Sequence, residues 1–139
     1  MDQSIKIWGP KFWYVLHMIA FNYPKTPNDV TKKKYYETIM NIPLFLPNII
    51  MGNKFSKLLD IYPVAPYLDS RESFIKWTHF IHNRINEQLG LPIFTYAEFI
   101  ELYTKTKREG HNKYQWVKQY NIQVMMILAI IISLIYKLS

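Results

Sequence analysis

The sequence predicts an all-α fold: a four-helix bundle with a short fifth helix, followed by a C-terminal transmembrane helix. Three observations support the prediction. Apolar residues recur at spacings of three and four along most of the chain. No stretch alternates apolar and polar residues between hairpin turns. Half of the 139 residues are apolar, which suits one domain with a single core and is too little chain for two.

The first two helices are predicted from their apolar spacing and their caps. Residues 8–22 carry apolar and aromatic side chains one helical turn apart. The second helix follows a proline, and Asn28 or Asp29 is placed to act as its N-cap. We therefore expect two helices that each present one apolar face to a common core.

Prolines delimit the third helix. Pro43 and Pro47 interrupt the chain before it, and we expect a short helix from just after Pro47 to Leu59. The segment that follows contains Pro63 and Pro66, which exclude regular structure there. This helix is therefore expected to be connected to the next one by a loop.

The fourth helix is the longest that the pattern predicts. Asp69 or Ser70 is placed to cap its start, and the apolar spacing continues through Leu89. Gly90 stands where a left-handed residue would end the helix, and a proline follows two residues later.

The C-terminal part completes the predicted domain organisation. Thr95 is placed to cap a fifth helix at residues 96–105, which closes a helical domain over residues 1–104. Residues 105–118 form a basic linker, and residues 119–138 form a continuous apolar segment.

The apolar segment predicts a membrane anchor. It carries no charge between Lys118 and Lys137, and as a helix it would span roughly 27 Å, close to the roughly 30 Å of a bilayer's hydrocarbon core. Basic residues precede it, so the positive-inside rule places the N-terminal domain on the cytoplasmic side. The alternatives are a buried core helix and a helix that docks on a partner protein.

The formal charge of +7 allows an anionic partner but does not identify it. The basic residues concentrate in "TKKKYY" and in the linker at residues 105–118. A basic segment beside a predicted membrane span is explained by anionic lipid head groups, so we do not expect nucleic-acid binding.

The chain contains no cysteine. A disulfide, a thiolate nucleophile and a zinc–cysteine site are therefore excluded within it. There is also no glycine-rich phosphate loop and no spacing typical of a serine nucleophile elbow. The common signatures of an enzyme are thus absent.

Two sets of polar and aromatic residues stand at helical spacing. Trp13 and His17 lie one turn apart on the first helix. The second set lies along the fourth helix: Trp77, His79, His82, Asn83 and Asn86. Taken singly, such residues are often hydrogen-bonded core residues. A zinc site at the two histidines of the second set lacks an evident third ligand.

Several motifs recur in a fixed order along the chain. They are Trp8-Gly9, Trp13, Leu16-His17, Pro24, Leu46-Pro47, Phe55, Leu58, Tyr62-Pro63, Trp77, His82-Asn83, Asn86, Leu89 and Pro92. This order and spacing resemble the FAD-linked sulfhydryl oxidase family, known as Erv/ALR, over about residues 6–104. The resemblance implies a four-helix bundle with a short fifth helix that holds FAD at one end.

The resemblance also names FAD as the candidate cofactor and indicates its site. By position, the site comprises Gly9, Trp13, His17, Trp77, His82, Asn83, Asn86 and Leu89. Trp13 and His17 would contact the flavin nucleotide, and the histidine and asparagines of the fourth helix would line its adenine and ribose. Leu91 stands where the family usually has a lysine for the pyrophosphate, and Arg84 and Lys11 are candidates to replace that charge.

The stretch "LPNIIMGNKF" departs from the family, which has Pro-Cys-x-x-Cys there. Asn48 and Met51 occupy the two cysteine positions. A carboxamide cannot become a useful nucleophile, and a thioether has no proton to lose and forms no disulfide. Thiol–disulfide exchange requires an attacking sulfur, and no other cysteine can supply one. We therefore expect the fold to be retained without the family's chemistry.

These features predict a catalytically inactive, membrane-anchored structural or interaction protein. Family members commonly pair through their first helices, so the resemblance implies a homodimer. The many residues with AT-rich codons and the family's members in large DNA viruses point to a virion or capsid-associated role. The alternative is an FAD-binding flavoprotein, or a partner of an active sulfhydryl oxidase.

Overall fold

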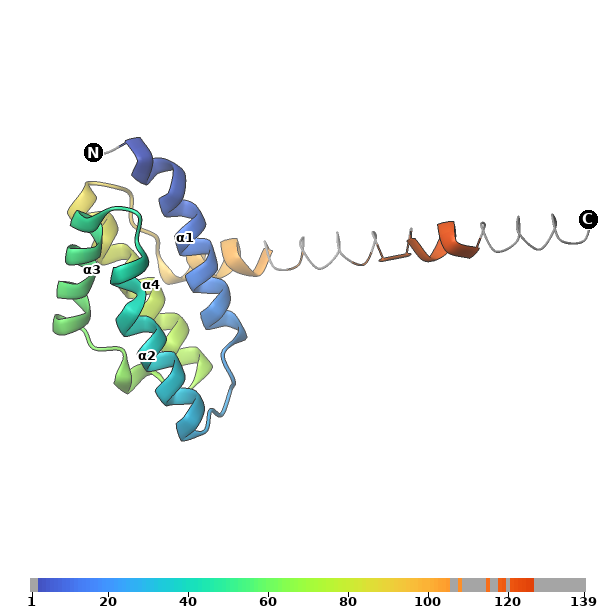
Figure 1. Cartoon of the computed structure of the whole chain (residues 1–139), viewed down its shortest axis with the longest axis horizontal. Coiled ribbons are helices and arrows are strands. Elements are labelled where there is room, and N and C mark those ends of the chain that lie inside the picture. The colour runs from blue at the N-terminus through green and yellow to red at the C-terminus, as the bar shows by residue number, and fades with distance from the viewer. Residues whose placement is uncertain (1–2, 106–107, 109–114, 116–117, 120, 127–139) are drawn as a thin grey trace, which may run out of the picture. The chain divides into compact units, whose positions relative to one another are not determined.

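The computed structural model describes residues 3–105, 108, 115, 118–119 and 121–126, and these contain helices and no strand (Figure 1). The predicted all-α class is therefore confirmed. The helices are α1 (Gln3–Asn22), α2 (Asp29–Phe45), α3 (Ile49–Ile61), the 3-10 helix η1 (Ala65–Tyr67) and α4 (Arg71–Leu89). A further helix follows at residues 96–105. The chain divides into two compact units between Phe99 and Ile100.

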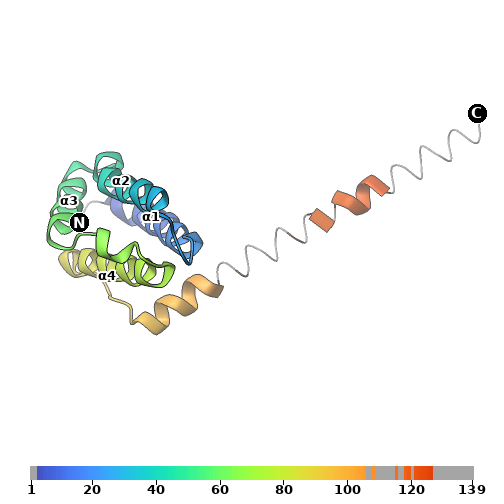
Figure 2. The same cartoon turned by 90° about the horizontal axis from the view of Figure 1, so that it is seen from below.

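The four long helices form a bundle within the first unit (Figures 1 and 2). Helix α1 packs mainly on α4, and α2 packs mainly on α3. The first turn of α1, the α2–α3 connection and the last turn of α4 lie at the same end of the bundle (Figure 1). The core between the helices includes Leu16, Ala20, Ile39, Phe55, Leu59, Phe74, Trp77 and Ile81.

Helix α2, helix α4 and the helix at residues 96–105 begin where local sequence signals predict, and α4 also ends there. The side-chain oxygens of Asn28 and Ser70 accept hydrogen bonds from backbone N–H groups three residues later, at 2.8 and 3.1 Å. Thr95 and Glu98 cap the helix at residues 96–105 reciprocally, at 2.8 and 3.3 Å. Gly90 ends α4 with φ of 66°, in the left-handed region. Of the alternative caps, Asn28 and Ser70 are thus the ones used.

Pro10 and Pro43 lie inside helices, although the sequence predicted a helix boundary near each of them. Helix α1 begins at Gln3, five residues earlier than predicted, and runs through Pro10. Helix α2 likewise continues through Pro43. A proline removes one backbone hydrogen bond, to the carbonyl four residues before it. Packing of each helix in the bundle stabilises the turns on both sides of that lost bond.

Gly52 allows α3 to approach α2 closely. A Cβ atom at this position would lie 2.6 Å from the carbonyl oxygen of Pro43, which is backbone and cannot rotate away. Gly9 in α1 is different, because the nearest atom to its Cβ would be Ile5 Cγ2 at 3.8 Å.

These two glycines provide a matched pair of variants. We expect Gly52→Ala to lower the free energy of unfolding by about 1–3 kcal/mol, because α2 and α3 must separate. Gly9→Ala should raise it by about 0.5–1 kcal/mol, since alanine has the higher helix propensity. Urea denaturation followed by far-UV circular dichroism measures both. Equal stability of the two variants would contradict this explanation of Gly52.

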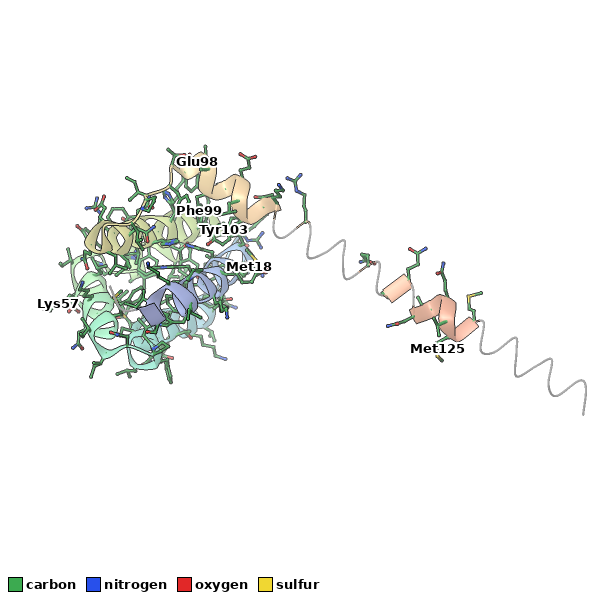
Figure 3. All side chains as sticks on the ribbon, turned by 90° about the horizontal axis from the view of Figure 1, so that it is seen from above. Met18, Lys57, Glu98, Phe99, Tyr103 and Met125 are labelled. Atoms are coloured by element: carbon green, nitrogen blue, oxygen red, sulfur yellow. The ribbon has the colours of Figure 1, made fainter. Side chains whose placement is uncertain are left out.

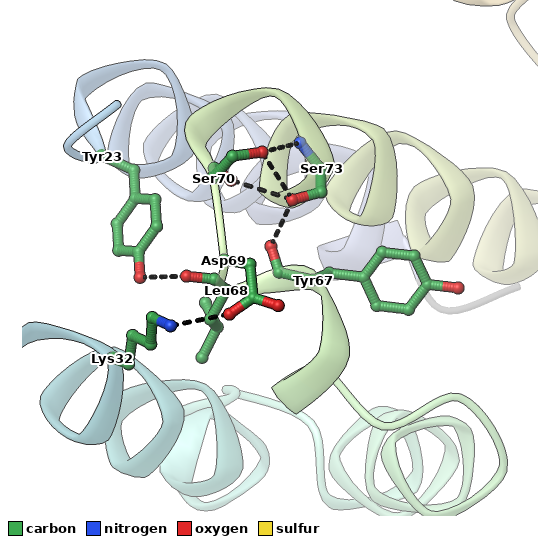
Figure 4. Close-up of polar contacts among 7 residues, drawn as sticks. All are labelled: Tyr23, Lys32, Tyr67, Leu68, Asp69, Ser70 and Ser73. Carbon is green, nitrogen blue, oxygen red and sulfur yellow. Dashed lines mark hydrogen bonds and ion pairs between the residues drawn. The ribbon is translucent and has the colours of Figure 1, made fainter. Parts of the chain in front are cut away.

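Polar contacts tie the end of α1 to the start of α4 (Figure 4). The buried Tyr23 donates its hydroxyl proton to the carbonyl of Leu68 at 2.8 Å, and Arg71 Nε donates to the carbonyl of Tyr23. Lys32 and Asp69 form an ion pair at 2.7 Å beside them. This end of the bundle is therefore closed by hydrogen bonds across three segments of the chain.

No helix among the residues that the structure describes is long and apolar enough to cross a bilayer. The predicted anchor at residues 119–138 lies mostly outside the described residues, of which only 119 and 121–126 fall within it. Most of the predicted linker at residues 105–118 lies outside them as well. The membrane anchor therefore stays a prediction.

Candidate functional site

Three residues singled out in the sequence lie together between α1 and α4. Trp13 and His17 come from successive turns of α1, and His82 comes from α4. The rings of Trp13 and His82 stack with centroids 4.1 Å apart and planes 14° apart. Trp13 also stacks on His17 at 5.7 Å. We call these three residues the ring cluster; they are all buried, and His17 is completely so.

A chain of hydrogen bonds runs through the ring cluster. Thr78 donates its hydroxyl proton to the carbonyl of Ile75 at 2.9 Å. Because Thr78 has already donated its hydroxyl proton, its Oγ1 is the acceptor in the next bond, and Nδ1–H of His17 donates to it at 3.2 Å. Nε2 of His17 then accepts from Nδ1–H of His82 at 3.0 Å. This order leaves Nε2 of His82 unprotonated and able to accept a hydrogen bond.

Burial keeps both histidines of the ring cluster neutral. Desolvation, with smaller contributions from His82 and His79, lowers the pKa of His17 from 6.5 to about 2. Desolvation, with a contribution from His79, lowers the pKa of His82 from 6.5 to about 4. At neutral pH the two imidazoles therefore act as hydrogen-bonding groups and not as cations.

The asparagines of α4 fasten the segment that follows the helix. Asn83 Nδ2 donates to the carbonyl of Phe94 at 2.8 Å, and the N–H of Phe94 donates to Asn83 Oδ1 at 3.1 Å. Asn86 Nδ2 donates to the carbonyl of Pro92 at 2.8 Å. His79 Nε2 donates to the same Phe94 carbonyl at 2.8 Å. These polar groups thus have a structural role at the start of the fifth helix.

Two residues of the site were not singled out in the sequence. Thr78, which is fully buried, bonds His17, and its position one turn before His82 is a signal that could have indicated it. Phe99 lies edge-on to His17 with centroids 4.7 Å apart, and its ring centroid is 4.9 Å from that of His79. No local signal indicates Phe99, because its neighbours come from distant parts of the chain.

The other predicted site residues lie elsewhere. Trp77 is 1% exposed and donates its indole N–H to the carbonyl of Tyr62 at 3.1 Å. It stands about 140° around α4 from His82, since the two are five residues apart. Gly9 is buried one turn before Trp13, and Leu89 is the half-buried last residue of α4. None of these three joins the ring cluster in the described contacts.

Arg84 and Lys11 were the candidates to replace the lysine that the family usually has at position 91. Neither of them faces the ring cluster. Arg84 pairs with Glu87 at 2.9 Å and lies 5.2 Å over the ring of Phe80. It is two residues from His82, hence on roughly the opposite side of α4. Lys11 is exposed and stands in the same relation to Trp13 on α1. Neither residue is therefore placed beside the ring cluster.

The positions of the family's two cysteines form the start of α3. Asn48 is the N-cap, and its Oδ1 accepts a hydrogen bond from the backbone N–H of Met51 at 3.0 Å. Met51 is 5% exposed and thus belongs to the core. The two positions that the resemblance assigns to the family's cysteines are thus a helix cap and a core contact.

Replacing the cap tests this reading. We expect Asn48→Ala to lower the free energy of unfolding by about 1 kcal/mol, since one backbone N–H loses its partner. Asn48→Ser should restore most of the loss, because serine also caps helices well. Thermal denaturation of the two variants beside the unmodified chain measures the difference. An alanine variant as stable as the serine variant would show that the cap contributes nothing.

Whether the ring cluster can hold FAD depends on which of its ring faces and polar atoms already have partners within the protein. The facing sides of Trp13 and His82 are in contact, so no planar ring fits between them. The amides of Asn83 and Asn86 already bond backbone. Nε2 of His82 has no hydrogen bond to a described residue. The residue types and their common location fit a flavin nucleotide, toward which His82 would present this nitrogen.

Comparison with known proteins relates this arrangement to one family. A match to the Erv1/Alr family spans residues 10–105. The chain is 33% identical over 111 residues to a probable FAD-linked sulfhydryl oxidase of Acanthamoeba polyphaga mimivirus, and 78% of each chain is covered. It is 30% identical over 99 residues to the FAD-linked sulfhydryl oxidase of African swine fever virus, covering 71% of this chain and 82% of the relative.

Solved structures share the fold. The yeast Erv1 core superposes with a TM-score of 0.67 at 24% identity, covering 74% of this chain and 86% of that one. The FAD-binding domain of Erv1 from Saccharomyces cerevisiae also gives a TM-score of 0.67, at 26% identity, covering 76% of this chain and 96% of that one. The similarity thus extends over most of the residues that the structure describes.

Proposed function

The chain belongs to the Erv1/Alr family, and we propose that it is a member without oxidase activity, serving as a membrane-anchored structural or interaction protein. One observation carries the proposal. Asn48 and Met51 occupy the family's cysteine positions as a helix cap and a core residue, and the chain has no cysteine at all. Exchange of thiols and disulfides cannot proceed without an attacking sulfur.

The sequence supports a membrane location for this domain. The uncharged segment between Lys118 and Lys137 has the length and composition of a single span, and the basic linker before it favours a cytoplasmic N-terminal domain. The named relatives in mimivirus and African swine fever virus support a role in a virion or at an assembly site. The partners would then be virion or capsid proteins.

A homodimer is part of the proposal. Tyr14 and Val15 are exposed on α1, at 43% and 54%, and provide apolar surface for a second copy. Light scattering of the purified chain should give the mass of two copies, and Val15→Glu should reduce it to one. A monomer at all concentrations would remove the dimer from the proposal.

Measurement of oxygen consumption tests whether the chain lacks oxidase activity. With dithiothreitol and added FAD, we expect the chain to consume oxygen no faster than a protein-free control. In the control variant Asn48→Cys/Met51→Cys, the two sulfurs stand at the N-cap and third residue of α3, as in a Cys-x-x-Cys motif. Thiol titration should show that this variant forms a disulfide. Oxidation of dithiothreitol by the unmodified chain at enzymatic rates would refute the proposal.

Membrane fractionation tests the anchor separately. The full chain should sediment with membranes and resist extraction by alkaline carbonate. Ile130→Lys/Ile131→Lys should release it, because two charges at the centre of a span cost several kcal/mol. Release of the unmodified chain by carbonate would contradict a membrane-spanning segment.

The ring cluster favours one alternative function, an FAD-binding flavoprotein or a partner of an active sulfhydryl oxidase. Trp13, His17 and His82 remain together, and Nε2 of His82 can accept a hydrogen bond from a ligand. Bound FAD would supply a two-electron redox centre. Purified protein with flavin absorbance that is lost in His82→Ala would support this alternative, and colourless protein that takes up no added FAD would remove it.

A further inference from the structure

The connection between α2 and α3 exposes large apolar side chains. Leu44 and Phe45 end α2 with 79% and 80% of their surface exposed. Ile49 and Ile50 begin α3 with 80% and 64% exposed. We call residues 44–50 the apolar corner. Contiguous exposed apolar surface of this kind marks an interaction site more often than ordinary surface.

Further apolar residues gather at the same end of the bundle. The first turns of α1 lie at this end and carry Ile7, which is 67% exposed (Figure 1). The segment after α4 adds Ile93, which is 56% exposed. The opposite end is closed by the hydrogen bonds and ion pair drawn in Figure 4. The opposite end exposes fewer large apolar side chains, among them Val30 and Ile61, each 64% exposed.

Lysines surround the apolar corner. Lys6 precedes Ile7 on α1, and Lys54 and Lys57 follow Ile50 by one and two turns on α3. Side chains on a helix lean toward its N-terminus, so both α3 lysines lean toward the corner. Lys57 projects outward from α3 (Figure 3). None of the three lysines forms an ion pair with a residue that the structure describes.

We propose that the apolar corner inserts into the interface of a membrane that contains anionic lipids, with the three lysines on lipid phosphates. Faces that lie in a membrane interface combine bulky apolar residues with flanking lysines, whose stems stay in the apolar layer while their charges reach the head groups. The cores of protein interfaces are instead depleted of lysine. This pattern favours lipid over a protein partner or a second copy.

The inference goes beyond the C-terminal anchor of the proposed function. A tail anchor alone does not determine which end of the domain faces the bilayer. Insertion of the corner would turn the end with the start of α1 and the α2–α3 connection toward the membrane, and would direct the end with η1 away from it. It also gives the domain an affinity for anionic lipid that does not depend on the tail.

The absence of cysteine allows a direct test with single labels. Phe45→Cys in the full chain is labelled with the environment-sensitive fluorophore NBD and added to vesicles of phosphatidylcholine with about one third phosphatidylglycerol. Tyr67 in η1 is 41% exposed, and Tyr67→Cys with the same label is the matched reference. We expect the label at position 45 to brighten, shift to the blue and be quenched by doxyl lipids. The fluorescence of the label at position 67 should remain that of a fluorophore in water, both with and without vesicles.

Charge reversal tests the lysines. Adding Lys6→Glu, Lys54→Glu and Lys57→Glu to the Phe45→Cys chain should abolish the lipid-dependent shift, because each lysine near an anionic surface contributes roughly fivefold, or about a hundredfold in total. Circular dichroism verifies that each labelled chain is folded. A shift that survives the three reversals would overturn the role of charge.

Other outcomes separate this inference from the proposed anchor. A label at position 45 that stays in water, on a chain that sediments with vesicles and resists carbonate, overturns the inference and leaves the anchor. A label that enters lipid on a chain that carbonate releases supports the inference and removes the anchor. A blue shift without lipid that grows with protein concentration shows that a second copy covers the corner, and overturns the inference.

Discussion

Lowering the pH from 8 to 5 is expected to reduce the free energy of unfolding by about 4 kcal/mol. His17 and His82 cause the loss, because burial lowers their pKa values from 6.5 to about 2 and about 4. Below pH 6.5 the unfolded chain binds a proton at each histidine, and the folded chain does not. Stability is therefore complete above pH 6.5 and falls as the pH decreases. At pH 5 each histidine accounts for about 2 kcal/mol.

Two measurements check this result. Urea denaturation at a series of pH values gives the free energy of unfolding, and nitrogen chemical shifts give the protonation of each imidazole. The carboxyl groups of Glu72 and Glu98 do not interfere, because hydrogen bonds to Lys76 and Thr95 lower their pKa values from 4.5. Their contributions are lost only in more acidic solution.

The double variant His17→Gln/His82→Asn is the control. Whatever its absolute stability, its free energy of unfolding should change little between pH 8 and 5, because the two titrating groups are gone. If the variant kept the pH dependence of the unmodified chain, the buried pair would not be its cause.

Trp77→Ala should lower the free energy of unfolding by about 3–5 kcal/mol. Trp77 is 1% exposed and packs on Phe74 with ring centroids 6.1 Å apart. Its removal would leave a large cavity in the core and the carbonyl of Tyr62 without its hydrogen bond. The resemblance to flavoproteins assigned Trp77 to the cofactor site, whereas its contacts predict a structural role.

Trp77→Phe distinguishes the two roles. It keeps most of the packing and loses the bond to Tyr62, so we expect a loss of about 1–3 kcal/mol. FAD titration, followed by flavin fluorescence, should give the same result for this variant as for the unmodified chain. A variant with unchanged stability and altered FAD binding would place Trp77 in the cofactor site.

The proposed loss of the redox site would require few residue changes. In a Cys-x-x-Cys motif at a helix start, the helix N-terminus stabilises a thiolate. Asn48 places a carboxamide oxygen in that position, where it accepts the N–H of Met51. The helix keeps its cap and the bundle keeps its core, so the chemistry can disappear without loss of the fold.

Several features were predictable because they depend on neighbouring residues alone. The caps at Asn28, Ser70 and Thr95 bond groups three residues away, and Gly90 adopts its conformation for reasons of backbone sterics. The absence of cysteine, on which the proposed loss of oxidase activity rests, is read from the sequence without any knowledge of the fold. Apolar spacing likewise predicted the helices of the bundle.

The tertiary structure decided what depends on contacts between distant segments. Packing carries α1 through Pro10 and α2 through Pro43, against the local preference of proline. Asn83 looked like a ligand-binding residue, yet its amide bonds the backbone of Phe94. Spacing places a polar side chain on one face of a helix, but only the folded chain determines which of its atoms already have partners.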